Sequence, residues 1–158
     1  MDLEKNYKFE RPGKNREKLL ALEKEGKYVF HGSSDIIDIL EPRQAGGHNE
    51  KTGKWENDGS PAVFATPYAD LAIFRSLLYD KDLENEFGIN GDQLHMRADK
   101  KLIERAKNRI GKVYVLDKSK FNPASFRGID CRSEEKITPL EIIEVTINDL
   151  PKNIEITE

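Results

Sequence analysis

The sequence predicts an α+β fold in a single domain of 158 residues, built on mostly antiparallel β-sheet with flanking helices. The chain is long enough to bury a hydrophobic core, and short apolar runs typical of strands recur along it. Helical patterns precede and interrupt these runs, but strands and helices do not alternate regularly, which disfavours a doubly wound parallel sheet. We expect a core over about residues 27–148, with residues 1–14 as a flexible N-terminal segment.

The first half of the chain predicts helices around two strands. Leucines recur at helical spacing from Asn15, the expected cap residue, and Gly26 suits the position just past the helix end. The polar, glycine-rich stretch 43–61 is long enough to be functional or mobile. The expected elements are a helix at 15–26, a strand at 28–30, one or two helical turns at 36–40, a strand at 62–66 and a helix from Pro67.

The second half predicts two more strands and a hairpin. The pair Asn90-Gly91 is a strong tight-turn signal, so a small hairpin is expected within 85–98. The remaining expected elements are a helix at 99–110, a strand at 112–117, an irregular or short-stranded stretch at 121–135 and a strand at 140–147.

Composition and motifs exclude several classes of function. The net charge of −3 gives no global attraction to nucleic acid or to an anionic membrane. The single cysteine, Cys131, rules out an internal disulfide, and the three histidines are too far apart for common metal-site spacings. Phosphate-cradle and nucleophile-elbow motifs are absent as well. With no apolar run near 18 residues, we expect a cytoplasmic protein without a membrane span or a metal.

The stretch YVFHGSS, residues 28–34, places a histidine and a glycine at the end of a strand. A glycine there lets a flat ligand approach the backbone, whose N–H and C=O groups can pair with an amide. His31 would supply a hydrogen bond beside them. The alternative is a histidine that finds a carbonyl partner where a loop begins.

Further motifs follow His31-Gly32-Ser33 in a recognisable order. They are Leu40-Glu41-Pro42-Arg43, PAVFAT at 61–66, the helix with Phe74, and DCRSEEKI at 130–137. This order and spacing resemble the ADP-ribosyltransferase superfamily, which includes poly(ADP-ribose) polymerases and bacterial rifampin ADP-ribosyltransferases. The resemblance covers roughly residues 27–148. It implies a split, mostly antiparallel β-sandwich whose cleft binds NAD as a substrate and needs neither a metal nor a protein nucleophile.

The resemblance also implies roles for individual residues. His31 would contact the nicotinamide ribose, the backbone of Gly32 would hold the carboxamide, and Ser33 matches the small hydroxyl residue after them. Phe74 would stack on the nicotinamide. Arg43 would reach the adenosine ribose or the diphosphate.

One departure from the family pattern concerns the aromatic ring on the second strand. Many members carry an aromatic residue where this chain has Val63. Phe64 and Tyr68 are the candidate replacements, and Tyr68 is kept as a candidate for cofactor binding. Strand alternation turns Phe64 to the opposite face from Val63, so we expect Phe64 in the core.

A second departure concerns the catalytic carboxylate. Asp130 best matches the polymerase-type glutamate by its distance from the last strand, and Glu135 is the second candidate. Glu134 and Glu141 are rivals. The rifampin-type aspartate has no acidic counterpart near Phe121.

Three functional hypotheses follow. The first is ADP-ribosyl transfer from NAD, or NAD hydrolysis, with an acceptor that is a protein, a nucleic acid or a small molecule. An RNA 2′-phosphotransferase-like variant would use Arg43, Arg75 and Arg132 near a phosphate. The second is a nucleotide-binding module without turnover, and the third is an interaction domain in which His31 only packs. Trp55 in the long loop is a candidate platform for the acceptor or the adenosine.

Overall fold

The computed structural model describes residues 13–43, 46–48, 53–57, 60–90, 93–124 and 129–158, and for 46–48, 55–57 and 90 it describes the backbone alone. Residues 1–12 of the segment expected to be flexible therefore lie outside the described residues. The side chain of Trp55 and the Gly91 half of the expected tight turn lie outside them as well.

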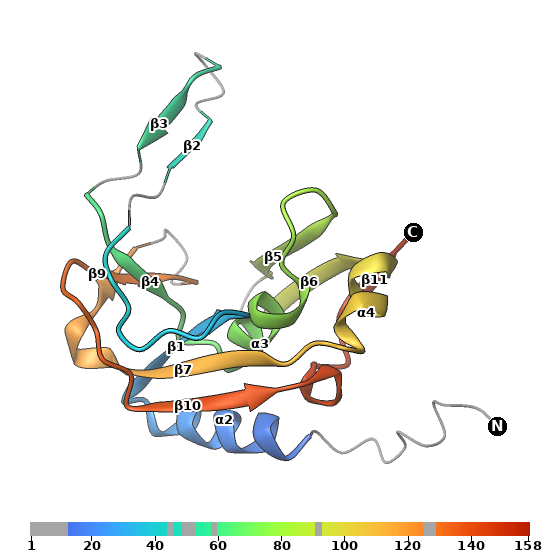
Figure 1. Ribbon diagram of the computed structural model, residues 1–158, viewed down its shortest axis with the longest axis horizontal. Helices are drawn as coiled ribbons and strands as arrows, with labels where there is room; N and C mark the ends of the chain where they lie inside the picture. Colours follow the sequence, from blue (N-terminus) through green and yellow to red (C-terminus); the bar gives the residue numbers. More distant parts are fainter. Residues whose placement is uncertain (1–12, 44–45, 49–52, 58–59, 91–92, 125–128) are drawn as a thin grey trace.

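Helices and strands follow one another irregularly along the described chain (Figure 1). The helices are α2 (Lys14–Glu25), α3 (Ala69–Leu78) and α4 (Lys100–Ala106), with 3-10 turns η1 (Lys118–Lys120) and η2 (Ile147–Asp149). The strands are β1 (Tyr28–Ser33), β2 (Gly46–His48), β3 (Trp55–Asn57), β4 (Val63–Ala65), β5 (Asn85–Asn90), β6 (Gln93–Asp99), β7 (Gly111–Asp117), β8 (Asn122–Pro123), β9 (Cys131–Ser133), β10 (Glu141–Val145) and β11 (Glu155–Thr157). None of the helices in the described ranges is long and apolar enough to cross a bilayer.

The strands form a mostly antiparallel arrangement, which confirms the predicted α+β class. The central sheet has the order β1-β7-β10, and a second sheet has the order β4-β9-β8. A third sheet, β11-β6-β5, contains a parallel pair of β11 with β6, and β2 pairs with β3 in a hairpin that projects from the body (Figure 1).

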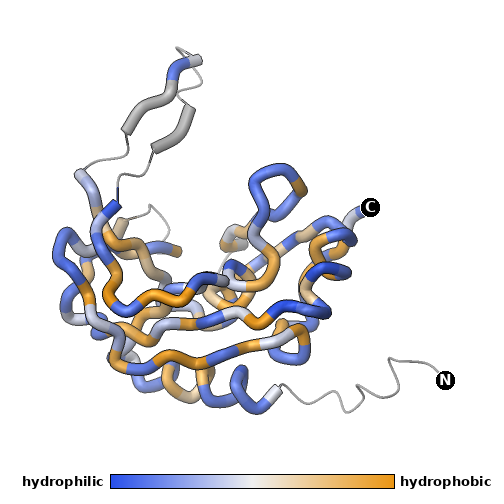
Figure 2. Tube along the Cα trace, viewed as in Figure 1, coloured by the Kyte–Doolittle hydropathy of each residue, from blue (hydrophilic) through white to orange (hydrophobic). Residues whose placement is uncertain are grey.

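The core lies on both faces of the central sheet, because side chains alternate along β1 and β7. On one face, Phe30, Val113 and Val115 pack with helix α3 and with Leu19 of α2. On the other face a second set packs with the second sheet: Val29, Tyr114, Leu116, Leu40, Val63, Ala65 and Ile137. Figure 2 shows the apolar residues gathered on these central strands and on α3.

Helix α2 holds the beginning of α3 through two carboxylates. The guanidinium of Arg16 makes a double hydrogen bond to Asp70, at 2.8 and 2.9 Å, and both side chains are about four-fifths buried. Glu23 accepts a hydrogen bond from the backbone N–H of Ala69 at 2.6 Å, and burial raises the pKa of that carboxyl group. Acidic groups at a helix N-terminus are stabilising, so these contacts fix where α3 begins.

Several predicted elements are confirmed with shifted ends. Helix α2 ends at the left-handed Gly26, with φ of 71°, as predicted. Its cap residue is Gly13 rather than Asn15, whose side-chain amide instead donates to the carbonyl of Glu144. The hairpin β5–β6 and the strands β4, β7 and β10 are confirmed, whereas α4 ends four residues before the predicted end.

The prediction of helical turns at 36–40 is wrong. This segment is irregular, with bends, and Leu40 forms an antiparallel bridge with Ile137 through two hydrogen bonds of 2.9 Å. The apolar side chain of Leu40 is therefore buried by a partner far along the chain and not by a helix. The expected end of the first strand before His31 is also wrong, because β1 continues to Ser33.

Candidate functional site

The end of β1 has one open edge. β1 pairs with β7 along its whole length, but on its other edge it forms a single bridge just after β4, where Phe30 and Thr66 exchange hydrogen bonds of 2.7 and 2.8 Å. Backbone groups alternate in direction along an antiparallel ladder, so the N–H and C=O of Gly32 point the same way as those of Phe30. Beyond the bridge no described strand pairs with this edge. Gly32 therefore offers one donor and one acceptor at the place where the two sheets separate.

The α-carbon of Gly32 faces helix α3 at very close range. A Cβ placed there would lie 1.9 Å from the carbonyl oxygen of Ala72 and 2.8 Å from its carbon. The φ of Gly32 is not in the left-handed region, so the glycine is required by space and not by conformation. The space beside the α-carbon of Gly32, where we expected a ligand, is thus occupied by the backbone of α3. A ligand can reach Gly32 only at the open edge of β1.

His31 lies on the opposite face of the sheet, and its Nδ1 lies 2.8 Å from the carbonyl oxygen of Phe64. A carbonyl only accepts hydrogen bonds, so Nδ1 carries the hydrogen. Burial lowers the pKa of His31 and outweighs the hydrogen bond to Phe64, and the positive charges of Arg75 and Arg43 lower it further. The ring is therefore neutral at pH 7, and its Nε2 holds a lone pair.

The His31 face opens into a cavity of about 560 Å³, which we call the His31 hollow. It brings together three predicted site residues, His31, Ser33 and Arg43. Its other lining residues are Asp35, Ile36, Ile37, Asp38, Ile39, Leu40, Glu41, Ala62, Val63 and Phe64. The volume falls within the range usual for small-molecule sites.

On the second strand, β4, the structure exchanges the expected places of Val63 and Phe64. Val63 is buried in the core with 4% of its surface exposed, whereas Phe64 is half-buried and lines the His31 hollow. The guanidinium carbon of Arg132, the partner of Phe64 across β4 and β9, lies 5.7 Å from the centre of its ring. The prediction that Phe64 belongs to the core is therefore wrong, because the face of β4 that carries Val63 packs against the central sheet and Phe64 lies on the opposite face.

A second cavity lies on the α3 side of β1, with a volume of about 430 Å³, and we call it the Arg75 hollow. Its lining residues are Gly32, Ser33, Ser34, Asp35, Arg75, Ser76, Tyr79, Asn85, Phe87 and Arg109. The two hollows share Ser33 and Asp35, so they meet just past the end of β1.

Asp35 is a carboxylate that the sequence reasoning missed. Its backbone is held in place, because its carbonyl accepts from the hydroxyl of Tyr114 at 2.6 Å and its N–H donates to Ser33 Oγ at 3.0 Å. The only signal in the sequence was its position directly after YVFHGSS.

Asp130 does not line either hollow. It accepts two hydrogen bonds from the guanidinium of Arg75, at 2.8 and 3.3 Å, and both side chains are about three-quarters buried. The guanidinium carbon of Arg75 lies 4.3 Å from the centre of the Phe87 ring. The carboxylate is therefore next to the Arg75 hollow, with a cation between it and the cavity.

The three glutamates lie elsewhere. Glu135 and Glu134 line a third cavity of about 480 Å³ with Lys120, Asn122, Arg132 and Ser133. Glu141 pairs with Lys18 on the face of the central sheet that α2 covers.

The three arginines proposed to hold a phosphate lie apart. Arg43, Arg75 and Arg132 each line a different cavity, so the structure does not bring them together.

The predicted stacking residues lie in the core. Phe74 has 1% of its surface exposed and packs inside the cluster beneath α3. Tyr68 is partly buried against the same cluster. In these positions neither ring presents a face to either hollow.

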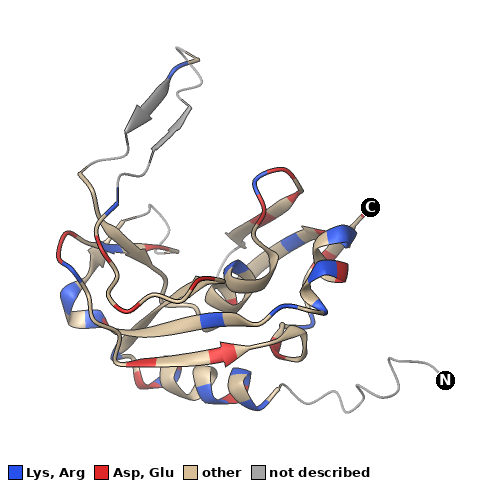
Figure 3. Cartoon of the chain, in the orientation of Figure 1, with Lys and Arg blue, Asp and Glu red and all other residues tan. Residues whose placement is uncertain are grey.

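Charged residues gather on α2, on α4 and around the hairpin β5–β6, whereas β1 itself carries none (Figure 3). The remaining nucleophile, Cys131, is half-buried, and burial raises the pKa of its thiol to about 12. Its thiol is therefore protonated at neutral pH, and it donates to the carbonyl of Ala65. Within the described ranges, no three metal-ligating side chains lie together.

Comparison with protein-family models, with curated proteins and with solved structures found no match for this chain.

Proposed function

We propose that this protein transfers ADP-ribose from NAD, or hydrolyses NAD, at the end of β1. The observation that carries the proposal is the open edge at Gly32, which offers one N–H and one C=O beside the neutral ring of His31. A carboxamide is complementary to such a pair, because it accepts through its oxygen and donates through its nitrogen. The nicotinamide group of NAD carries this carboxamide.

The reaction needs few protein groups. The bond between C1′ of the ribose and the nicotinamide nitrogen breaks, and its electron pair goes to the nitrogen, which loses its positive charge. Water or an acceptor adds to C1′ and gives up a proton. The transition state resembles an oxocarbenium ion, as in glycoside hydrolysis, so a nearby carboxylate and a rigid leaving-group pocket are the main requirements.

Asp35 is the carboxylate best placed for this role, because it lines both hollows where they meet. The charge of Asp130 is offset by Arg75, and Glu135 lines the third cavity. The lone pair on Nε2 of His31 is suited to accept a hydrogen bond from a ribose hydroxyl. Arg43, which lines the same hollow, is suited to the diphosphate.

The test is the release of labelled nicotinamide from NAD by the wild-type protein and by His31→Gln. We expect the variant to lose about 100-fold or more in rate, since it removes a group that touches the substrate. His95→Gln is the matched control, because His95 lies exposed on β6 and lines neither hollow. Equal rates for wild type and His31→Gln would exclude catalysis at this site.

The carboxylate is identified by the same assay. Asp35→Asn is expected to abolish turnover, whereas Asp130→Asn and Glu135→Gln should keep most of it. Full activity of Asp35→Asn with loss in Asp130→Asn would return the role to Asp130.

A second candidate function is binding of a nucleotide without turnover. The observation that favours it is the burial of both Val63 and Phe74, which leaves no ring from these positions to stack on nicotinamide. NAD at 100 times its dissociation constant would then stabilise the fold by about 2.7 kcal/mol without any release of nicotinamide.

A further inference from the structure

We infer that the Arg75 hollow is a second ligand site, which binds the base and phosphate of a nucleotide, either free or at the end of a single-stranded nucleic acid. The phosphate would lie at Arg109 and the base against Tyr79. Binding at this site is independent of NAD, whereas a role for the bound nucleotide as the acceptor of ADP-ribose rests on the proposed function.

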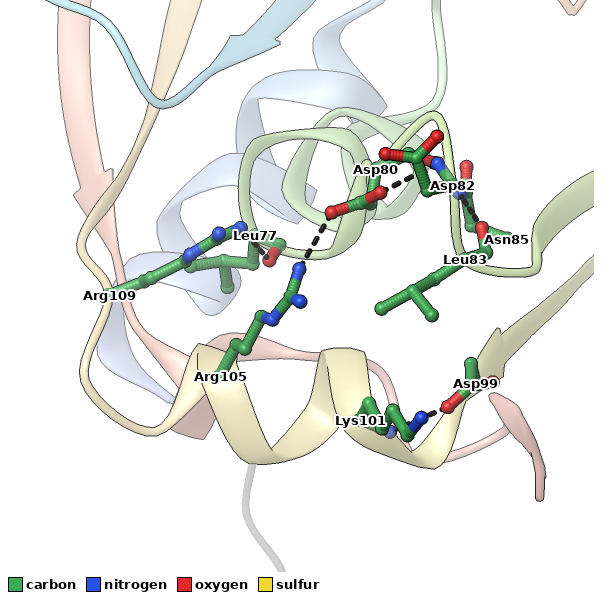
Figure 4. Close-up of polar contacts among 9 residues, drawn as sticks. All are labelled: Leu77, Asp80, Asp82, Leu83, Asn85, Asp99, Lys101, Arg105 and Arg109. Carbon is green, nitrogen blue, oxygen red and sulfur yellow. Dashed lines mark hydrogen bonds and ion pairs between the residues drawn. The ribbon is translucent and has the colours of Figure 1, made fainter.

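Arg109 differs from the neighbouring arginines in its partners. The other two arginines near the end of α3 have carboxylate partners: Arg75 pairs with Asp130, and Arg105 pairs with Asp80, each at 2.8 Å or less. Arg109 lines the hollow, and its guanidinium donates a long hydrogen bond of 3.4 Å to the carbonyl of Leu77 (Figure 4). Within the described part of the chain, no carboxylate lies at salt-bridge distance from it. A half-buried guanidinium without a counter-ion favours an anion, and phosphate matches its geometry.

Two exposed aromatic rings line the same hollow. Tyr79 has 64% of its surface exposed and Phe87 has 38%, although both are large apolar side chains. One face of Phe87 is already covered by the guanidinium of Arg75. Tyr79 follows α3 directly, one helical turn after Arg75, and its ring is available for stacking. Exposed aromatic rings beside arginines are the usual platform for unpaired bases.

Asn85, which also lines the hollow, offers a polar group for the edge of a base. The side-chain nitrogen of Asn85 donates to the carbonyls of Asp80 and Leu83, the first at 2.5 Å and the second at 2.8 Å (Figure 4). These bonds hold the amide in place and leave its carbonyl oxygen as an acceptor. An exocyclic amine of a base is a donor of the matching kind.

The position of the hollow fits an acceptor site. It shares Ser33 and Asp35 with the His31 hollow, so a ligand in one lies next to a ligand in the other. If NAD is cleaved at Gly32, a hydroxyl or amine of the bound nucleotide can attack C1′ and pass its proton to Asp35 or to water.

The test measures binding to the whole chain without NAD, by calorimetry with adenosine monophosphate, inorganic phosphate and a single-stranded oligonucleotide bearing a terminal phosphate. Arg109→Gln should weaken the binding of all three by about tenfold or more. Tyr79→Ser should weaken adenosine monophosphate by about fivefold or more and leave inorganic phosphate unchanged. Lys107→Gln is the matched control, because it removes one charge from the same turn outside the hollow.

Each outcome decides the proposal. Tighter binding of the oligonucleotide supports a strand end as the ligand, and equal binding supports a free nucleotide. Absence of saturable binding by the wild type would overturn the proposal. So would binding that depends on Arg43 in the His31 hollow and not on Arg109. Nicotinamide release is not part of this measurement, so failure of the proposed function leaves the result intact.

Discussion

The two faces of β1 differ sharply at its end. On one face, Gly32 lies against the backbone of Ala72, and a network of Arg75, Asp130 and Phe87 ties α3 to its neighbours. On the other face, His31 makes one hydrogen bond to Phe64, and the loop beside it exposes large apolar side chains. Ile36 in that loop has 79% of its surface exposed.

The two faces therefore differ in how easily a ligand can change their structure. The Gly32 face is fixed by a helix backbone, which cannot move without moving the whole of α3. The His31 face is built from single side-chain contacts and an irregular segment, so a ligand can alter it at lower cost. Measurements on each face can test this distinction.

The largest expected effect is that of Gly32→Ala. The new Cβ would overlap the carbonyl of Ala72, so we expect the free energy of unfolding to fall by about 3 kcal/mol in urea denaturation. Gly88→Ala on β5 is the control, because a Cβ there meets nothing within 4 Å and stability should change by less than about 0.5 kcal/mol. Similar stabilities for the two variants would show that α3 does not pack closely against β1 at Gly32.

An intermediate effect is expected from the ion pair on the same face. Asp130→Asn leaves the three-quarters-buried guanidinium of Arg75 without its counter-ion, and we expect a loss of about 2 kcal/mol. Glu104→Gln breaks the exposed pair with Lys107 and should cost less than about 0.5 kcal/mol. A double-mutant cycle with Arg75→Gln would show whether the pair itself is responsible, and additive losses would speak against it.

The smallest effect is the pH dependence that His31 confers. Its pKa is lowered in the folded protein, so as the pH falls through the unfolded value of about 6.5 the unfolded state takes up the proton first. Stability should therefore decrease from about pH 7.5 to 5.5, with a slope of at most about 1.4 kcal/mol per pH unit. His31→Gln should flatten this profile in thermal unfolding, whereas His95→Gln should keep it. An unchanged slope in His31→Gln would show that burial of this ring is not the cause.

Part of the site could be predicted from the sequence because its residues are neighbours in the chain. His31, Gly32 and Ser33 are consecutive, and the apolar residues before them identified the strand that carries them. Arg43 follows the short segment that lines the same hollow. Phe64 was misplaced, because alternation predicts two opposite faces but does not tell which face a second sheet covers.

The other candidate residues depended on contacts between distant parts of the chain. Asp130 is separated from Arg75 by 55 residues, and no local pattern indicates that these charges meet. Phe74 has the spacing of a stacking residue, but α3 carries it on its buried face, inside the core cluster. Asp35 was marked in the sequence only by its position after YVFHGSS, and its place where the two cavities meet became visible in the tertiary structure alone.

The sequence by itself determined the α+β class, the positions of the main strands and the end of α2 at Gly26, because apolar periodicity and glycine at a helix end act over a few neighbouring residues. The tertiary structure alone decided why Gly32 must be a glycine and which groups surround His31. The nearest atoms to Gly32 belong to a helix 40 residues further along the chain, and the partner of His31 is 33 residues away. YVFHGSS therefore identifies the strand, and the packing of α3 and β4 against it defines its two faces.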